Sequence, residues 1–263
     1  MKKVISKDGT SIAYDQAGRG PALILVDGAF GSRTFGPNGA MVPLLSDKFT
    51  VYTYDRRGRG DSGNTAPYAV EREIEDLEAV IQAAGGSAML YGISSGAGLV
   101  LEAVNAGLPV TKVALYEAPF ITDDSRKPLP DNFPAHLDEL VKAGKPEVVK
   151  EFMTKGVNVP GFAVVMMRFM PAWSKLKALA PTVVYDMIIV NPHQHGKPFE
   201  PGVWPAVTMP TLVISGGKSP AWMQNGMKSL AGILPNGQHR TLEGQTHIVK
   251  AEVLAPVLKE FFS

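Results

Sequence analysis

The sequence predicts an α/β fold, a doubly wound and mostly parallel sheet that an inserted all-helical segment interrupts. Short aliphatic runs alternate with segments of helical period from residue 22 to residue 116. Runs that are apolar on both faces suit the central strands of a parallel sheet. The alternation stops after a Pro-rich stretch and resumes near residue 211. We therefore assign 1–120 and 206–263 to an α/β core and 121–205 to a helical cap insert, which is too long to be an ordinary loop.

The first half of the core contains the clearest strand and helix signals. A turn at Lys7–Asp8–Gly9 separates two short strands, and two β-branched-rich runs follow. Ile74, Leu77 and Val80 recur at helical spacing, which predicts an amphipathic helix. The expected strands are 3–6, 11–15, 22–26, 50–54, 88–91 and 112–116, and the expected helices are 68–84 and 97–106.

The insert contains helical patterns, and the core pattern returns after a second Pro-rich stretch. A strand, a helix, a strand and a final amphipathic helix complete the doubly wound arrangement. The insert helices are expected at 135–143, 147–155, 161–170 and 182–190, and the last core elements at 211–215, 221–234, 239–242 and 253–262.

The composition excludes several classes of protein. The chain of 263 residues has 26 Lys and Arg against 25 Asp and Glu, so nothing points to nucleic acid or an anionic membrane as a partner. It contains no Cys, which excludes disulfides, thiolate metal sites and a Cys nucleophile. No secretory signal and no apolar run of roughly 18 residues is apparent. We expect a soluble cytoplasmic protein that acts on a small molecule, of undetermined oligomeric state.

The strongest local signal is Gly92–Ile93–Ser94–Ser95–Gly96, between an expected strand and an expected helix. This is the G-x-S-x-G pattern in the strand–turn–helix context that its mechanics require. The glycines permit a sharp turn on which Ser94 stands clear of the sheet as a nucleophile. The backbone N–H of Ser95 then becomes available to a developing oxyanion.

A serine nucleophile requires a base, and histidine is the usual one. His247 follows the last expected strand, so it lies at the carboxyl edge of the sheet, where Ser94 also lies. His239 begins that strand and lies at the opposite end. A metal site at His193 and His195 is not expected, because no carboxylate cluster completes it. His136, His193 and His195 all fall in the insert.

Ser94 and His247 occur together with a third feature, the segment Asp55–Arg56–Arg57–Gly58–Arg59–Gly60–Asp61–Ser62–Gly63. On these features the chain resembles the α/β-hydrolase superfamily, in its serine-nucleophile, esterase- and lactonase-like branch with a helical cap. The resemblance implies that no metal or organic cofactor is needed, and that the segment from Asp55 is a structural turn. It also implies an oxyanion hole formed by the N–H groups of Ala29 and Ser95. The family often has His where this chain has Asp27.

The acid of the triad departs from the usual family position. That position follows the strand 211–215, where this chain has Ser219 and no carboxylate. Some relatives, haloalkane dehalogenases among them, take the acid from the end of the preceding strand, which here is Glu117. Glu117 keeps the chain order Ser, acid, His. Glu243, or a Ser–His dyad without an acid, are the alternatives.

A serine nucleophile favours acyl chemistry, because haloalkane dehalogenases and epoxide hydrolases of this fold use aspartate. We expect hydrolysis of a carboxylic ester or lactone with a small to medium apolar substrate. A C–C hydrolase, a lyase of hydroxynitrile type using Lys218, or a catalytically weak ligand-binding protein are the alternatives. No basic residue is clearly placed to bind a substrate carboxylate, and Arg168 is expected to be solvated. The expected pocket residues are Phe30, Met166, Met170, Trp173 and Tyr185.

Overall fold

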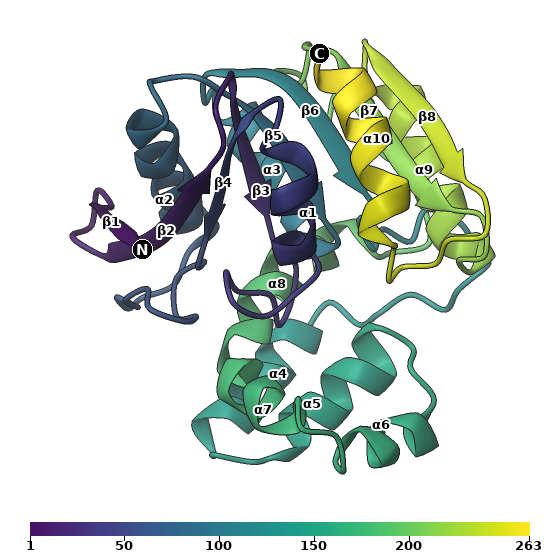
Figure 1. Ribbon diagram of the computed structural model, residues 1–263. Helices are drawn as coiled ribbons and strands as arrows, with labels where there is room; N and C mark the ends of the chain where they lie inside the picture. The colour runs from purple at the N-terminus through teal and green to yellow at the C-terminus, as the bar shows by residue number, and fades with distance from the viewer.

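The computed structural model describes residues 1–263 as one eight-stranded sheet with helices on both faces and a layer of helices beside one edge (Figure 1). The strand order is β1-β2-β4-β3-β5-β6-β7-β8, antiparallel at β1–β2 and β2–β4 and parallel elsewhere. The predicted fold class, doubly wound and mostly parallel, is confirmed. The strands are β1 (Lys2–Ile5), β2 (Ser11–Ala17), β3 (Ala22–Val26), β4 (Thr50–Tyr54), β5 (Ala88–Ile93), β6 (Val110–Tyr116), β7 (Thr211–Gly216) and β8 (Gly237–Leu242).

The helices divide between the sheet and the layer beside it. Those on the sheet are α1 (Asn38–Leu45), α2 (Val70–Ala83), α3 (Ser95–Asn105), α9 (Ala221–Ile233) and α10 (Ala251–Phe262). The segment between β6 and β7 contains α4 (Phe133–Lys142), α5 (Glu147–Glu151), a π-helical turn (Phe152–Gly156), α6 (Gly161–Met167), α7 (Trp173–Leu179) and α8 (Val183–Val190). Figure 1 shows these helices together on the side toward which the parallel strands point.

Alternate residues of the central strands pack against opposite helical layers. In β3, Leu23 and Leu25 join the apolar cluster that contains residues of α1 and α10, whereas Ile24 and Val26 join the cluster with α2, α3 and α9. A strand turns successive side chains to opposite faces. A central strand buried on both faces must therefore be apolar throughout, as β3 is.

Two helices were not expected from the sequence. Helix α1 contains Gly39 and Pro43, which disfavour helix in isolation, and its contact with α10 compensates by burying Met41 and Leu45. Helix α7 buries Leu176 and Leu179. The expected helix 161–170 is shorter than predicted, since α6 ends at Met167. No helix has the length and apolar character needed to cross a bilayer.

Helix α8 holds the helical layer against the core through α3. A Cβ on Gly98 of α3 would lie 3.0 Å from Ile189 Cγ2 and 3.3 Å from Val190 Cγ1, so glycine permits the close approach of the two helices. Because α3 begins at Ser95, this contact brings α8 next to the turn that carries the expected nucleophile.

Candidate active site

Ser94 lies on a tight turn between β5 and α3. Its φ is +57° and its ψ is −131°, a conformation that L-residues rarely adopt. The N–H of Ser94 donates to the carbonyl of Tyr116, at the end of the neighbouring strand β6. The turn therefore presents the Ser94 side chain at the carboxyl edge of the sheet, where it lines two cavities.

The glycines around Ser94 are required by close contacts. A Cβ on Gly92 would lie 2.7 Å from Ala97 Cα, and one on Gly96 would lie 2.5 Å from the carbonyl oxygen of Val26. A Cβ on Gly28, in the loop after β3, would lie 2.7 Å from Ser94 Cβ. The turn and the loop after β3 thus approach each other more closely than any larger residue would allow.

His247 and Glu117 form a hydrogen-bonded pair at the same edge. His247 Nδ1 lies 2.9 Å from Glu117 Oε2, and Glu117 is fully buried. The backbone N–H of Gly216 donates to the other carboxylate oxygen, Oε1, at 2.7 Å. The Tyr116 hydroxyl donates to the carbonyl of Thr246 at 2.6 Å and so holds the loop that carries His247. Because Nδ1 faces the carboxylate, Nε2 is the ring nitrogen of His247 that remains for proton transfer.

The other expected candidates lie elsewhere. Glu243 is exposed and makes no bond to His247, and Ser219 is buried with no hydrogen-bond partner for its hydroxyl. Lys218 is exposed and does not line the cavities that contain Ser94. The other four histidines lie beside different residues: His239 by Ser215, His136 by Glu151, His193 by Glu102 and His195 by Asp131.

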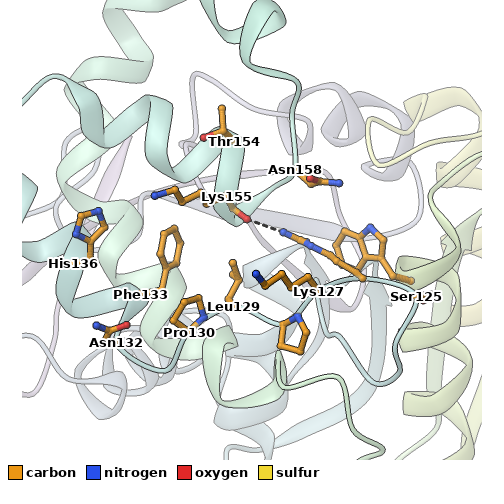
Figure 2. Close-up of a pocket in the computed structure, with 13 residues that line it drawn as sticks. Ser125, Lys127, Leu129, Pro130, Asn132, Phe133, His136, Thr154, Lys155 and Asn158 are labelled. Carbon is orange, nitrogen blue, oxygen red and sulfur yellow. Dashed lines mark hydrogen bonds between the residues drawn. The ribbon is translucent and has the colours of Figure 1, made fainter.

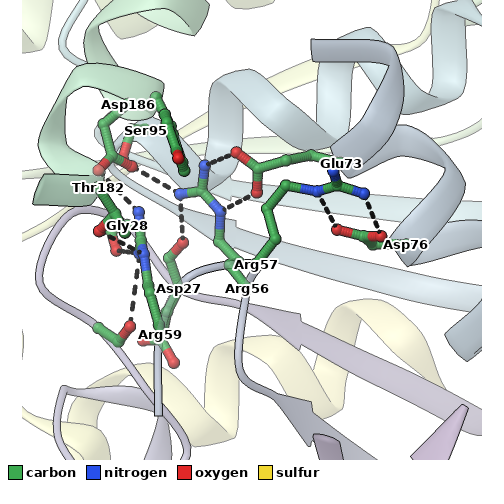
Figure 3. Close-up of polar contacts among 12 residues, drawn as sticks. Asp27, Gly28, Arg56, Arg57, Arg59, Glu73, Asp76, Ser95, Thr182 and Asp186 are labelled. Carbon is green, nitrogen blue, oxygen red and sulfur yellow. Dashed lines mark hydrogen bonds and ion pairs between the residues drawn. The ribbon is translucent and has the colours of Figure 1, made fainter. Parts of the chain in front are cut away.

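Two buried arginines hold the loop after β3 through its carbonyl groups. Arg56 Nη1 donates to the carbonyl of Asp27 at 3.2 Å, and Arg59 Nη1 donates to that of Gly28 at 2.6 Å (Figure 3). The C=O and N–H of a trans peptide point in opposite directions. The N–H of Ala29 is therefore turned away from Arg59. Ser95 is the first residue of α3, so its N–H also has no partner within the helix.

Asp27, the first residue of this loop, has a buried carboxyl group. It is only 2% exposed, and its Oδ1 has no hydrogen-bond partner. Burial raises the pKa of Asp27 to about 7, against the opposing charges of Arg59 and Arg56. The carboxyl packs against backbone, because a Cβ on Gly31 would lie 2.8 Å from Asp27 Cγ.

Asp186 of α8 is a buried residue that the sequence reasoning did not identify. It accepts hydrogen bonds from Arg56 at 2.6 Å, from Arg59 at 2.7 Å and from the hydroxyl of Ser95 at 2.7 Å (Figure 3). Burial acts to raise its pKa, but the charges of Arg59 and Arg56 outweigh burial and lower it. One feature of the sequence could have identified Asp186: it is the only charged residue in the otherwise apolar run that forms α8.

The segment that begins at Asp55 organises this network. Arg56 also forms a two-pronged ion pair with Glu73, with both contacts at 2.6 Å. Arg57 forms one with Asp76, with both contacts at 2.8 Å (Figure 3). Neither Arg57 nor Asp76 lines the cavities that contain Ser94. The arrangement agrees with the expected structural role of this segment.

Two cavities meet at Ser94 and His247. The larger has a volume of about 660 Å³ and includes Phe30 and Ala29 in its lining. The smaller, of about 30 Å³, lies between the core and the helical layer. The larger is lined by Asp27, Gly28, Ala29, Phe30, Gly31, Thr34, Phe35, Gly36, Pro37, Ile93, Ser94, His247 and Ile248.

Four of the five expected pocket residues do not line either cavity, and Phe30 alone does. Met166 and Met170 are 65% and 55% exposed, because the apolar side of α6 and the turn after it faces outward. Trp173 is half-buried. Tyr185 stacks on Tyr68, with ring centroids 3.8 Å apart. The expectation was wrong for these four residues because helical periodicity shows which residues share a face but not what that face contacts.

The sequence matches the alpha/beta hydrolase family over residues 17–252. A solved alpha/beta hydrolase from Sphaerobacter thermophilus is 45% identical, with full coverage of both chains and a TM-score of 0.92. An esterase from Exiguobacterium antarcticum is 18% identical, with 99% of this chain and 98% of the esterase covered and a TM-score of 0.73. An enol-lactonase from Burkholderia xenovorans is 17% identical, with 99% of each chain covered and a TM-score of 0.72. The family match and the first relative establish that the chain belongs to the alpha/beta hydrolase family.

Proposed function

We propose that this hydrolase cleaves a carboxylic ester or lactone through an acyl-enzyme on Ser94. The observation that carries the proposal is the pairing of His247 Nδ1 with the buried Glu117 at 2.9 Å, in a site where His247 and the strained Ser94 line the same cavities. A serine, a histidine and a buried carboxylate in these positions can perform nucleophilic acyl transfer.

Each residue has a distinct role in the proposed reaction. His247 takes the proton of the Ser94 hydroxyl as its oxygen attacks the carbonyl carbon, and Glu117 stabilises the resulting imidazolium. The N–H groups of Ala29 and Ser95 bind the oxyanion of the tetrahedral intermediate. His247 then gives its proton to the leaving alkoxide. A water molecule, deprotonated by His247, then attacks the acyl carbon; the bond to Ser94 Oγ breaks, His247 returns the proton to that oxygen, and the acid product leaves.

The lining of the larger cavity supports an apolar substrate of small to medium size. Phe30, Phe35 and Ile93 contribute apolar side chains, and the volume of about 660 Å³ is in the range typical of small-molecule pockets. The esterase and the enol-lactonase with the same fold act on bonds of this type. We also propose that residues 121–205 serve as a cap, since Phe152 and Met187 of this segment line the smaller cavity with Ser94.

Hydrolysis of p-nitrophenyl butyrate by the wild type and by Ser94→Ala tests the proposal. The activated ester reports acyl transfer without knowledge of the natural substrate. We expect Ser94→Ala to lower kcat by at least about a thousand-fold. Ser219→Ala is the matched control: it removes another buried serine hydroxyl, in a loop that forms no part of the proposed triad, and should retain wild-type turnover. Equal rates for Ser94→Ala and the wild type would contradict the proposal and favour C–C cleavage, a lyase reaction or ligand binding without turnover.

A further inference from the structure

Arg126 is a buried arginine without a carboxylate partner. It is 9% exposed, whereas the buried Arg56, Arg57 and Arg59 each pair with an Asp or Glu. Arg126 Nη2 donates to the carbonyls of Lys155 and Gly156, at 2.8 and 2.9 Å, and its buried Nη1 has no partner. A buried charge is costly unless it is paired, and burial lowers the pKa of Arg126 to about 10. The guanidinium therefore has a buried donor group, Nη1, for which the protein provides no acceptor.

A second unpartnered donor lies beside Arg126. The guanidinium carbon is 4.4 Å from the ring centroid of Trp222, a residue that is 5% exposed. The Nε1 of Trp222 is buried and donates to no acceptor. Arg126 and Trp222 therefore each have a buried N–H donor without an acceptor, on side chains that are in contact, and carboxylate oxygens are acceptors for both kinds of donor.

The cavity next to this pair carries positive charge and no carboxylate. It has a volume of about 690 Å³, and Arg126 and Trp222 contribute to its lining. Lys127 and Lys155 also line it (Figure 2). The ammonium of Lys155 is already paired with Glu151 at 2.7 Å. Lining residues of the cavity include no Asp or Glu. Arg126 is therefore the buried cation of this cavity that an incoming anion can pair with.

Trp222 connects this cavity to the catalytic site. It also lines the smaller cavity together with Ser94 and His247. Gly156, whose carbonyl accepts from Arg126, lines that smaller cavity as well. Trp222 and Gly156 thus border the smaller cavity at Ser94 and also contact the Arg126 guanidinium.

We propose that Arg126 and Trp222 form a carboxylate subsite, and that the substrate is an ester or lactone whose acyl part ends in a free carboxylate. The inference rests on the proposed acyl transfer at Ser94 and deepens it. The substrate carbonyl lies at Ser94, and the carboxylate at the other end of the acyl chain accepts from Arg126 Nη1 and Trp222 Nε1. Hydrolysis then releases a dicarboxylic acid, or from a lactone a dicarboxylic acid that bears a hydroxyl or keto group.

Paired substrates test the subsite. Mono-p-nitrophenyl adipate and p-nitrophenyl hexanoate have acyl chains of equal length and differ in a terminal carboxylate against a methyl group. We expect Arg126→Gln to reduce the ratio of kcat/KM on adipate to kcat/KM on hexanoate by at least about 30-fold, because a site built to bind a polar group discriminates strongly through it. Trp222→Phe, which keeps an aromatic side chain but removes the indole N–H, should reduce the ratio by a smaller factor. Arg168→Gln, a matched change of an exposed cap arginine near Trp173, should leave the ratio unchanged.

A parallel decrease on both esters would overturn the subsite, because Arg126 would then act only by holding the turn at Lys155 and Gly156. If Arg126→Gln fails to fold, Arg126→Lys keeps the charge but loses the guanidinium geometry, and it should still lower the ratio.

Binding of free adipate to Ser94→Ala, measured by calorimetry, tests the subsite without turnover. The subsite requires binding that Arg126→Gln weakens at least about 10-fold, as expected for a lost charge-assisted hydrogen bond. It also requires that adipate compete with the hexanoate ester in the wild type. Adipate that binds at Arg126 without competing would overturn the proposal and indicate a separate anion site. If Ser94→Ala still hydrolyses the hexanoate ester, acyl transfer at Ser94 fails, while adipate binding still reports on Arg126.

Discussion

Asp186→Asn tests whether the buried ion network fixes α8 to the turn at Ser94. The substitution keeps the shape of the side chain but removes the charge that Arg56 and Arg59 share. Arg56 retains Glu73, whereas Arg59 has no other carboxylate partner. Leaving one buried charge unpaired costs about 3–5 kcal/mol. For a chain of this size the loss corresponds to a decrease in Tm on the order of 10 °C.

Thermal and urea unfolding of the wild type and Asp186→Asn measure this loss. The matched control is Asp138→Asn, which removes a half-exposed carboxylate of α4 that pairs with Lys142 at 2.6 Å. The control should lie within about 0.5 kcal/mol of the wild type. A decrease for Asp186→Asn as small as that of the control would refute the reasoning, because the network would then contribute no net stability.

The pH dependence of stability gives a second measurement on the same variant. The arginines lower the pKa of Asp186 in the folded protein. Its contribution to stability is therefore complete above the unfolded pKa of about 4 and is lost as the pH falls through the folded pKa. Wild-type stability should decrease more steeply with acidification than that of Asp186→Asn. The network also holds the Ser95 hydroxyl and, through Arg59, the carbonyl of Gly28. The kcat of Asp186→Asn on p-nitrophenyl butyrate should therefore be lower than that of the wild type, even at temperatures at which the variant is fully folded.

Three further substitutions address the catalytic edge. Burial raises the pKa of Asp27 to about 7, so the folded protein retains a proton that the unfolded chain loses above about pH 4, and stability falls as the pH rises toward neutrality. Asp27→Asn should therefore remove the decrease in Tm between about pH 5 and about pH 8. The same decrease in the variant as in the wild type would contradict this reasoning. Gly28→Ala places a Cβ 2.7 Å from Ser94 Cβ, so kcat on p-nitrophenyl butyrate should drop by about 10- to 100-fold, whereas a wild-type kcat would show that the loop yields without cost. Glu117→Gln should lower kcat by at least about 100-fold with little change in KM; full activity would point to a Ser–His dyad.

Local sequence patterns predicted most of the fold and the three main residues of the candidate site. The turn at Ser94 follows from Gly92 at the end of a strand and Gly96 at the start of a helix, within a few residues of each other. The positions of His247 and Glu117 follow from a general rule, because residues after parallel strands collect at one edge of the sheet. The structure places both there, 2.9 Å apart. Helix α1 could not be predicted, since its Gly39 and Pro43 disfavour helix and only packing on α10 compensates.

The sequence by itself determined the layered α/β fold, the helical insert and the segments that meet at the catalytic edge, because periodicity and turn chemistry act over a few neighbouring residues. Only the tertiary structure decided which partner each side chain meets. Arg56, in the loop after β4, pairs with Asp186 of α8, while Arg126 is buried without a carboxylate. Met166 and Met170 face outward although their spacing is typical of a packed face. The charge and hydrophobicity of a residue are properties of the sequence, but burial and pairing depend on segments that come together only when the whole chain folds.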